Sequence, residues 1–389
     1  MTGYRELLAR PLTWWWLVAT VATRLAVCTV PLAAVFLAAE HTGSYAWGAV
    51  IAGAYAAGEA VAAPRMGARF QRRPLRPELS RVAVAEAVAL LGLVVSLRLG
   101  LPVAAVVLAA VGGGVAAGTF GGLRTLLVRS APDGRGSALA LDVIVNQACQ
   151  VAGPALVGVA VAVWSADAAL LVVAAALLVT PVVAGRLPGS LGAEGDAVVR
   201  GSARVVRAIW PAVVVVTVVL ALQAAVEVTL PSLLEHRGAP AAWAGAALSA
   251  LAVSSIAGSF LYGLRRRPGN ALRHTLVLAS LFALVVVAVG VVRSPVATVV
   301  LVGCAGCFQA AASTARSLTV TEALPAGSWS VGFSVLYSFA AVGFTAASVV
   351  SAVFLAAGDA AVFSTALGVG ACAVFALVGA VERGTRGTS

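Results

Sequence analysis

Twelve long runs of apolar residues divide the chain, and they limit its fold more than any other feature of the sequence. A helix needs about 20 residues to cross a hydrocarbon layer of about 30 Å, and each run is close to that length. Inside lipid, backbone polar groups must bond within the protein, which a helix achieves by itself. The sequence therefore predicts an all-α integral membrane protein with twelve transmembrane helices. The predicted spans are 12–38, 45–66, 79–98, 101–124, 137–163, 166–186, 207–231, 240–263, 273–292, 296–318, 328–356 and 359–382.

Charged residues are scarce, at 11% of the chain against about a quarter in soluble domains, and their placement predicts the topology. An even number of spans puts both termini on one side of the membrane. With the termini in the cytoplasm, 22 of the 26 basic residues, all of them arginines, fall on the cytoplasmic side and three fall outside. Cytoplasmic loops carry such an excess. We expect a multi-pass protein of the cell (plasma or inner) membrane with both termini cytoplasmic.

No stretch of the sequence is interpreted as a cofactor or metal site. The chain has no lysine, which a Walker phosphate-binding loop requires. Cys304 and Cys307 have the spacing of a redox or metal site, but they lie in a predicted span among small residues, where close helix packing is the alternative. We expect no cofactor, no metal and no nucleic-acid partner. The expected partners are a small-molecule substrate, protons and the lipid bilayer, and the protein is expected to be a monomer.

The second half of the chain repeats the first at an offset of 196 residues. Trp47 and Gly67 are 20 residues apart, and so are Trp243 and Gly263. The longest polar stretch lies between the halves and is rich in glycine, which is typical of a linker. We predict an N-terminal six-helix bundle at 1–187, a cytoplasmic linker at 188–206 and a C-terminal six-helix bundle at 207–389.

Two short motifs accompany this repeat. An arginine-rich loop after the second span reads Pro64-Arg-Met-Gly-Ala-Arg-Phe-Gln-Arg-Arg73, and a plainer copy between Tyr262 and Pro268 includes Arg265. The fifth predicted span contains Gly153 and Pro154, with Gly158 four residues further on.

Two six-span bundles in parallel repeat, joined by an inner linker, resemble the major facilitator superfamily of transporters. The first loop is similar to the family motif G-x-L-x-D-R-x-G-R-R, with Ala68 in place of the aspartate, so Asp133 in the loop after span four is a candidate partner for the arginines. The fifth span resembles the G-P-x-x-G-G motif of the drug-export branch at Gly153 and Pro154, with Gly158 displaced. The candidate inner-gate residues from the motif, its copy and this replacement are Gly67, Arg69, Arg72, Arg73, Asp133 and Arg265.

Polar residues within the spans gather in particular helices. A charge at mid-bilayer costs at least about 2.5–3.5 kcal/mol, so such residues face a bundle interior or water. In the family that the chain resembles, spans one, four, seven and ten line a central cavity, and the polar pattern here fits that arrangement. The candidate substrate or cavity residues are Arg24, Arg124, Asn146, Gln150, Gln223, Gln309 and Arg316. Arg124 and Arg316 stand near span ends, where snorkelling to the interface is the alternative.

Three acids within the spans are candidates for proton coupling: Glu59, Asp142 and Glu227. A carboxyl group removed from water favours its protonated form, which suits it to carry a proton. Asp142 shares one helix face with Asn146 and Gln150, and Glu227 shares a face with Gln223, because residues four apart lie on one side of a helix. Fixed salt bridges or hydrogen bonds between helices are the alternative role for each acid.

These features predict a secondary active transporter rather than an enzyme, since the sequence presents no catalytic constellation. We expect it to move a small organic molecule across the plasma membrane by alternating access. Proton-coupled efflux is the finer prediction. The alternatives are a uniporter or importer of a small metabolite, and a membrane scaffold or sensor that transports nothing.

Overall fold

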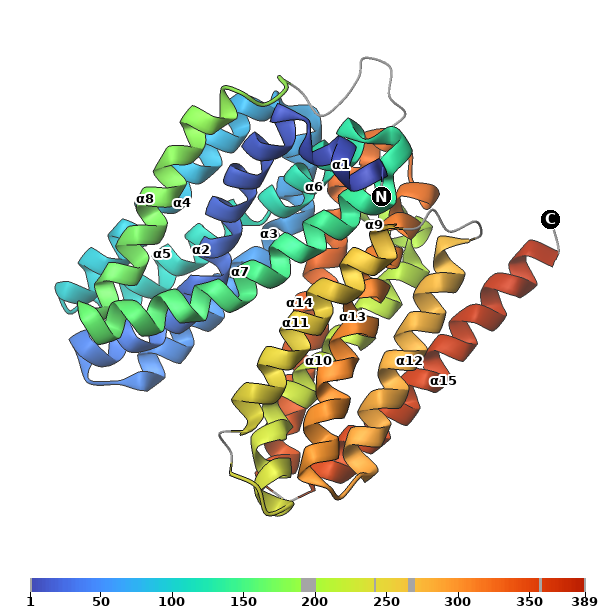
Figure 1. Cartoon of the computed structure of the whole chain (residues 1–389). Helices are drawn as coiled ribbons and strands as arrows, with labels where there is room; N and C mark the ends of the chain where they lie inside the picture. The colour runs from blue at the N-terminus through green and yellow to red at the C-terminus, as the bar shows by residue number, and fades with distance from the viewer. Residues whose placement is uncertain (1, 190–200, 241–242, 265–269, 357–358, 388–389) are drawn as a thin grey trace. The chain divides into compact units, whose positions relative to one another are not determined.

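The computed structural model describes residues 2–189, 201–240, 243–264, 270–356 and 359–387, and this described part contains helices and no strand. Contacts group the chain into two compact units, each a bundle of long helices (Figure 1). The first unit comprises Met1–Ala138, Val145–Val206 and Leu324–Ser338, and the second comprises Leu139–Ile144, Arg207–Ala323 and Phe339–Ser389.

The long helices follow the predicted spans. In the first half they are α2 (Pro11–Thr42), α3 (Tyr45–Arg72), α4 (Leu75–Arg98), α5 (Pro102–Ala116) with α6 (Thr119–Ser130), α7 (Arg135–Val163) and α8 (Ala166–Ala184). In the second half they are α10 (Trp210–His236), α11 (Trp243–Leu264), α12 (Ala271–Val291), α13 (Pro295–Ala323), α14 (Trp329–Ala356) and α15 (Ala360–Gly387). Short helices not predicted from the sequence are α1 (Thr2–Leu8), α9 (Ser202–Ala208) and the 3-10 turns η1 (Pro132–Gly134) and η2 (Ala326–Ser328).

Among the described residues, eleven spans are long and apolar enough to cross a membrane, with α5 and α6 counted as one. The twelfth is α3, whose 28 residues include Tyr55, Glu59 and several glycines that lower its hydropathy. The prediction of an all-α protein with twelve transmembrane helices is confirmed. The predicted linker at 188–206 includes residues 190–200, which lie outside the described part of the chain, so the proposed domain boundaries stay a prediction.

The two halves repeat the same helix packing. In the first unit α3 packs on α5, α4 packs on both α5 and α8, and α2 packs on α8; in the second, the same relations join α11 to α13, α12 to α13 and α15, and α10 to α15. A glycine allows the corresponding close approach in each: a Cβ on Gly113 would overlap the carbonyl of Tyr55, and one on Gly306 would overlap that of Leu251. Tyr55 and Leu251 stand at the repeat offset, which supports a duplicated bundle.

The fourth span is broken into α5 and α6 around Gly118, although the sequence favoured one helix. A Cβ on Gly118 would lie 2.8 Å from both the backbone and the side chain of Met66 on α3. The chain therefore approaches α3 closely at this point, which only glycine allows without displacement. The break places the start of α6 and its polar residues against α3.

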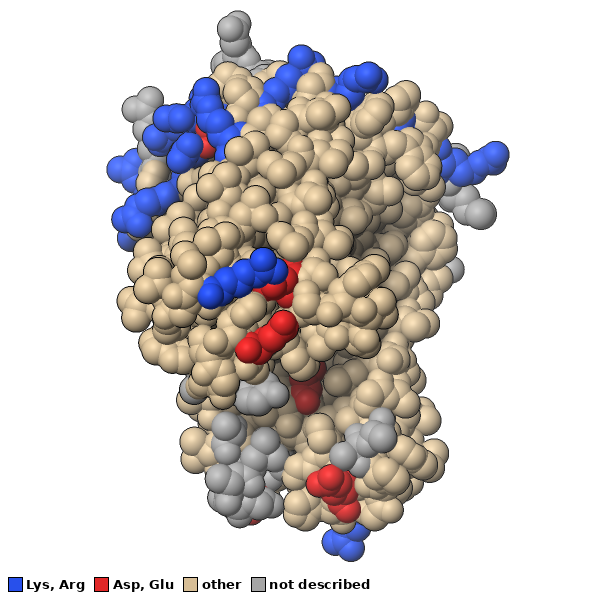
Figure 2. Space-filling model, turned by 90° about the vertical axis from the view of Figure 1, so that its left-hand side faces the viewer, with Lys and Arg blue, Asp and Glu red and all other residues tan. Residues whose placement is uncertain are grey.

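The outer faces of the bundles are apolar. On α5, Val103, Val107 and Val111 are exposed at four-residue spacing, whereas Ala105 and Ala109 are fully buried. A helix that turns its large apolar side chains outward and its small ones inward is suited to lipid, where small residues let helices pack closely. Figure 2 shows basic side chains gathered at one end of the face it presents, with a broad surface below that carries few charges.

Candidate functional site

Two buried arginines of the first unit lie against one phenylalanine ring. The guanidinium carbon of Arg24 on α2 is 4.5 Å from the centroid of the Phe120 ring, and that of Arg124 on α6 is 4.4 Å from it. Arg124 is also 5.3 Å from the Phe333 ring centroid. Both arginines are 4% exposed. Their burial supports a place within the bundle rather than snorkelling for Arg124.

The same cluster continues to a buried carboxyl group. Phe120 packs on Tyr337 of α14, with ring centroids 4.9 Å apart. The Tyr337 hydroxyl donates to Glu59 on α3 and lies 3.2 Å from each carboxylate oxygen. Glu86 on α4 is also buried, and it accepts a hydrogen bond of 2.9 Å from Tyr55. Aromatic residues thus connect the arginines to Glu59, and neither Tyr337 nor Glu86 was identified from the sequence.

The first three turns of α14 are bonded to α3 by a line of serines. Ser330 donates to the Gly67 carbonyl at 3.0 Å, and Ser338 donates to the Ala60 carbonyl at 2.8 Å. Between them, Ser334 occupies the place where a side chain at Gly67 would stand. The predicted inner-gate residue Gly67 is therefore a contact point between these helices.

In the second unit, three polar residues form one hydrogen-bonded chain. Gln309 on α13 donates to Gln223 at 2.7 Å, and Gln223 donates to Glu227 at 2.8 Å. The second bond joins residues four apart on α10, as the sequence spacing indicated. Arg316, which is 6% exposed, donates to Ser313 one turn earlier on α13 at 2.9 Å.

The polar face of α7 is divided between the two units. Asp142 is fully buried and belongs to the second unit, whereas Asn146 and Gln150 belong to the first. Asn146 is half-buried. Gln150 is exposed and accepts a 2.7 Å hydrogen bond from the Cys28 thiol.

The glycines of the motif in the fifth span differ in their surroundings. A Cβ at Gly153 would lie 2.8 Å from Cys28 atoms, so this glycine permits close packing of α7 on α2. Gly158 has open space around it, and Pro154 is exposed.

The loop arginines form ion pairs with an acid that the sequence did not single out. Arg69 lies 2.7 Å from the fully buried Glu78 carboxylate, and Arg73 and Arg81 lie 3.7 and 3.8 Å from it. Asp133 is in η1 and is exposed, as is Arg72 at the end of α3. Arg265 lies outside the described residues. In the described part of the chain Glu78, rather than Asp133, pairs with these arginines, and the inner-gate role of the loop stays a prediction.

A second charged cluster joins the ends of three helices in the first unit. Asp167, which is 3% exposed, lies 3.1 Å from His41 and accepts from Arg98 at 2.9 Å. Glu40 accepts a 3.1 Å hydrogen bond from the backbone amide of Ala166 at the start of α8. No sequence spacing would have revealed this cluster, because its members come from α2, α4 and α8.

Arg237 makes hydrogen bonds at the C-terminal end of α10 in the second unit. Arg237 donates to the Thr298 hydroxyl and the Val289 carbonyl, both at 2.6 Å, and to the Gly290 carbonyl at 3.3 Å. Partial burial lowers the pKa of Arg237 below its ordinary value. This residue ties α10 to α12 and α13.

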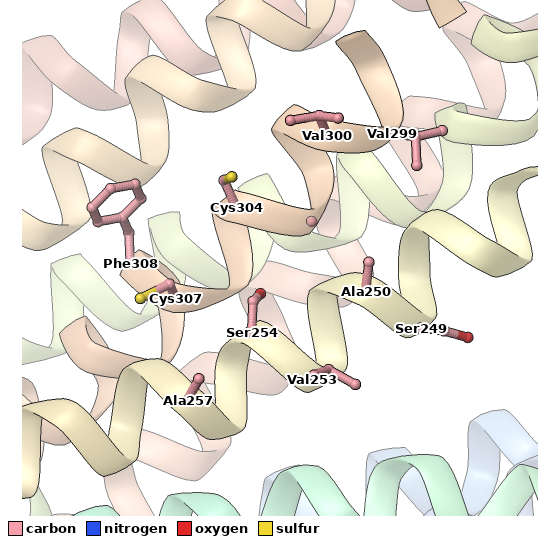
Figure 3. A pocket seen from close by; sticks show the side chains of 11 residues that line it. Ser249, Ala250, Val253, Ser254, Ala257, Val299, Val300, Cys304, Cys307 and Phe308 are labelled. Atoms are coloured by element: carbon pink, nitrogen blue, oxygen red, sulfur yellow. The ribbon is translucent and has the colours of Figure 1, made fainter. Parts of the chain in front are cut away.

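An open, apolar groove of about 820 Å³ lies between α11 and α13 (Figure 3). Its lining includes Cys304, Cys307 and Phe308 on α13, with Ser254 opposite on α11. Both cysteines are free thiols. Across the described residues, no group of three or more His, Cys, Asp or Glu side chains is placed to hold a metal ion.

The acids within the long helices differ in what they bond to. Glu78 and Asp167 pair with arginines, and a proton on either would leave those cations without their counter-ion. Glu59 and Glu86 instead accept from tyrosine hydroxyls, and Glu227 accepts from a glutamine amide, and all of these donors are neutral. Such a carboxyl group can gain or lose a proton without leaving a buried cation uncompensated.

No family model and no curated protein matches the sequence, but solved structures match its fold along almost its whole length. The human organic anion transporter MFSD10 is 16% identical with a TM-score of 0.72, covering 95% of this chain and 99% of that one. A bacterial homologue of the iron transporter ferroportin, in an outward-facing state, is 15% identical with a TM-score of 0.73, covering 95% of this chain and 100% of that one. The E. coli fucose:proton symporter FucP is 12% identical with a TM-score of 0.73, covering 94% and 97%.

Proposed function

From the major facilitator fold that this chain shares with solved transporters, we propose that it is a proton-coupled secondary transporter that exports a small organic molecule. The fold, a duplicated six-helix bundle, is the framework on which such proteins alternate access to a site at the repeat interface. Transport is proposed rather than catalysis, and the solved structures that support it are those of transporters for chemically different solutes.

The observation that carries proton coupling is that Glu59 and Glu227, two of the three candidate acids, are bonded to neutral donors. Glu59 accepts from Tyr337 at 3.2 Å, and Glu227 accepts from Gln223 at 2.8 Å. Removal from water favours the protonated form of a carboxyl group, and neutral partners leave no stranded charge when the proton arrives. We assign proton binding to Glu227, with Glu59 or Asp142 as the second group.

Substrate contact is assigned to the polar residues of the cavity spans. Arg24 and Arg124 supply charge in the first half, and Gln223, Gln309 and Arg316 supply donors in the second. Asn146 and Gln150 on α7 complete the proposed set. The preference for export comes from the motif at Gly153 and Pro154, and close packing of Gly153 on Cys28 supports a structural role for it.

Transport measurements test the proposal in two stages. Cells with and without the gene are first compared for sensitivity to drugs and metabolites, which identifies a transported compound. Flux of that compound into proteoliposomes is then measured with and without an imposed pH gradient. A gradient should drive accumulation by the native protein, and Glu227→Gln should abolish that drive. Glu235→Gln, an exposed acid at the end of the same helix, is the control and should behave as native. Flux indifferent to the gradient would refute coupling.

A uniporter or importer is the second candidate, and the same vesicles distinguish it. Downhill flux that a pH gradient leaves unchanged indicates a uniporter, and uptake driven with the proton gradient indicates an importer. A membrane scaffold or sensor would show no flux of any compound. The polar residues gathered within particular spans argue against that reading, since a scaffold does not need a polar cavity.

The arginine distribution supports a place in the plasma or inner membrane with both termini cytoplasmic. We also propose that the protein acts as a monomer. Reporter fusions at either terminus test the orientation: activity of a cytoplasm-dependent reporter at both ends is expected. Mass determination in detergent or nanodiscs tests the oligomeric state.

A further inference from the structure

Three arginines of the first unit share the single carboxylate of Glu78. Nitrogens of Arg69, Arg73 and Arg81 lie 2.7, 3.7 and 3.8 Å from its oxygens. The Glu78 side chain is fully buried, whereas those of the arginines are 43%, 52% and 64% exposed. These three residues, called the arginine cluster below, bring three positive charges to one negative charge, so the group keeps a net positive charge at the surface.

Glu78 does not occupy the hydrogen-bond donors of the arginine cluster. Among the described residues, neither Glu78 oxygen accepts a hydrogen bond, so the three contacts are ion pairs without hydrogen-bond geometry. A guanidinium group carries five N–H donors in a planar fork that matches the oxygens of a phosphate. Arg65 and Arg72, one turn to either side of Arg69 on α3, are also exposed and add positive charge. The cluster therefore has both charge and donors left for an anion.

Arg81 stands at the head of an exposed apolar stripe on α4. Val84, Val88 and Val95 follow it at intervals of three, four and seven residues, which keeps all four on one side of a helix with 3.6 residues per turn. All three valines are exposed, and α4 is long and apolar enough to cross a membrane. A molecule that fits this side of α4 has an anionic group at one end and an apolar chain behind it.

Charge and shape together narrow the class of partner to one kind of lipid. A zwitterionic headgroup brings its own cation to a group that is already positive, which offsets the attraction of its phosphate. A free phosphate gains only a charge interaction, which water and salt weaken at exposed arginines. An anionic phospholipid keeps its chains in the hydrocarbon beside the valines while its phosphate reaches the arginines, as basic groups at helix ends do with anionic lipids.

We infer that the arginine cluster binds an anionic phospholipid, whose phosphate pairs with Arg73 and Arg81 and whose acyl chain lies along the valines of α4. Arg69, the closest of the three, stays paired with Glu78. The lipid supplies the counter-charge that one carboxylate cannot give to three arginines. This binding goes beyond the proposed transport and does not depend on it. The excess of arginines on one side of the membrane sets orientation, whereas their convergence on Glu78 selects a headgroup.

Lipid binding to the purified full-length protein tests the inference without any transport step. Dioleoylphosphatidylglycerol is compared with dioleoylphosphatidylcholine, which has the same chains and no net charge. Dioleoylglycerol supplies the chains alone, and glycerol phosphate supplies the anionic group alone. Binding of each probe is titrated by native mass spectrometry, and the rise in melting temperature is measured in parallel. Phosphatidylglycerol should bind ten-fold or more tightly than each of the other three probes, and added salt should reduce this preference.

The main variant combines Arg73→Gln with Arg81→Gln, which removes two charges and leaves the closest ion pair of Glu78 in place. It should lose the preference for phosphatidylglycerol. Glu78→Gln changes the charge in the opposite direction, so it should bind phosphatidylglycerol at least as tightly as the native protein. The matched control combines Arg186→Gln with Arg383→Gln, which removes two charges from exposed arginines predicted to lie on the same side of the membrane. It should bind each lipid as the native protein does.

The inference is wrong if phosphatidylcholine or dioleoylglycerol binds as tightly as phosphatidylglycerol, because charge then does not select the lipid. Equally tight binding of glycerol phosphate would indicate a site for free anions and would also overturn it. Unchanged lipid preference in the Arg73→Gln and Arg81→Gln protein would exclude the arginine cluster, and an equal loss in the control would assign the effect to total charge. If the main variant fails to fold, the preference of the native protein among the four probes and the direction of the Glu78→Gln effect decide the question.

Discussion

The contact between α3 and α14 leaves no room for a methyl group at Gly67, so adding one predicts a specific change in how the two helices pack. A Cβ at Gly67 would lie 2.7 Å from the Ser334 Cβ, closer still to its hydroxyl oxygen, and 3.0 Å from the Ser330 carbonyl. Rotating Ser334 moves its hydroxyl but not its Cβ, which is fixed to the helix. Gly67→Ala must therefore push the first turns of α14 away from α3 by several tenths of an ångström or more.

Overpacking of this kind costs roughly 1–3 kcal/mol. If the packed arrangement of α3 and α14 is one of two states in a transport cycle, that cost lowers its population relative to the other state by about 5- to 150-fold. The displacement also weakens the 3.0 Å hydrogen bond from Ser330 to the Gly67 carbonyl. We expect Gly67→Ala to lower the melting temperature and to populate an arrangement in which these helices are apart.

The separation of α3 from the start of α14 is measured by pulsed electron paramagnetic resonance between spin labels attached at positions Arg72 and Ala326. The labelled protein has its native cysteines replaced. The control is Gly53→Ala, the same change on the same helix at a glycine with no atom within 4 Å of the added Cβ. It should leave the distance distribution as in the parent and should not lower the melting temperature, because alanine is the better helix former. Ser334→Gly should partly restore the Gly67→Ala protein, since the Ser334 hydroxyl is buried without a hydrogen bond. Identical behaviour of Gly67→Ala and Gly53→Ala would refute the reasoning.

Two further predictions concern charged residues outside the apolar cores. Glu78→Gln should lower the free energy of unfolding by about 1 kcal/mol, a modest value because its arginine partners are half exposed. It should also weaken transport more than Asp133→Asn does. A larger effect of Asp133→Asn on transport would restore Asp133 as the partner of the loop arginines. Arg237→Gln should lower the free energy of unfolding by about 1–3 kcal/mol, because glutamine cannot replace three charge-assisted hydrogen bonds. Thermal unfolding measures this loss of stability. The control is Arg293→Gln at an exposed arginine, whose stability should stay within about 0.5 kcal/mol of native.

Features set by a single helix could be predicted from the sequence. The spans follow from run length, and the Gln223 to Glu227 bond follows from four-residue spacing, which fixes the two side chains on one face. The duplicated packing follows from the repeat, as the glycine contacts at Tyr55 and Leu251 illustrate. Predicting each of these features requires no information about how a helix is rotated against its neighbours.

Features that depend on helix rotation and register could not be predicted. Tyr337 is 278 residues from Glu59, and only the register of α14 against α3 brings them together. The same holds for Asp167, whose partners come from α2 and α4. The break at Gly118 was missed because the sequence shows a permissive glycine but not the Met66 side chain that requires it.

The charge of the bonding partner separates acids that the sequence presents as alike. Glu59, Glu78 and Asp167 are all buried carboxyl groups in long helices, and each could be structural or proton-carrying on sequence grounds. Glu78 and Asp167 are bonded to arginines, so protonating either breaks an ion pair and costs the packing that depends on it. Glu59 is bonded to a hydroxyl that can stay in place whichever form the acid takes. A proton can therefore act at Glu59 without loosening the helices that hold it, and this asymmetry makes it a candidate for coupling.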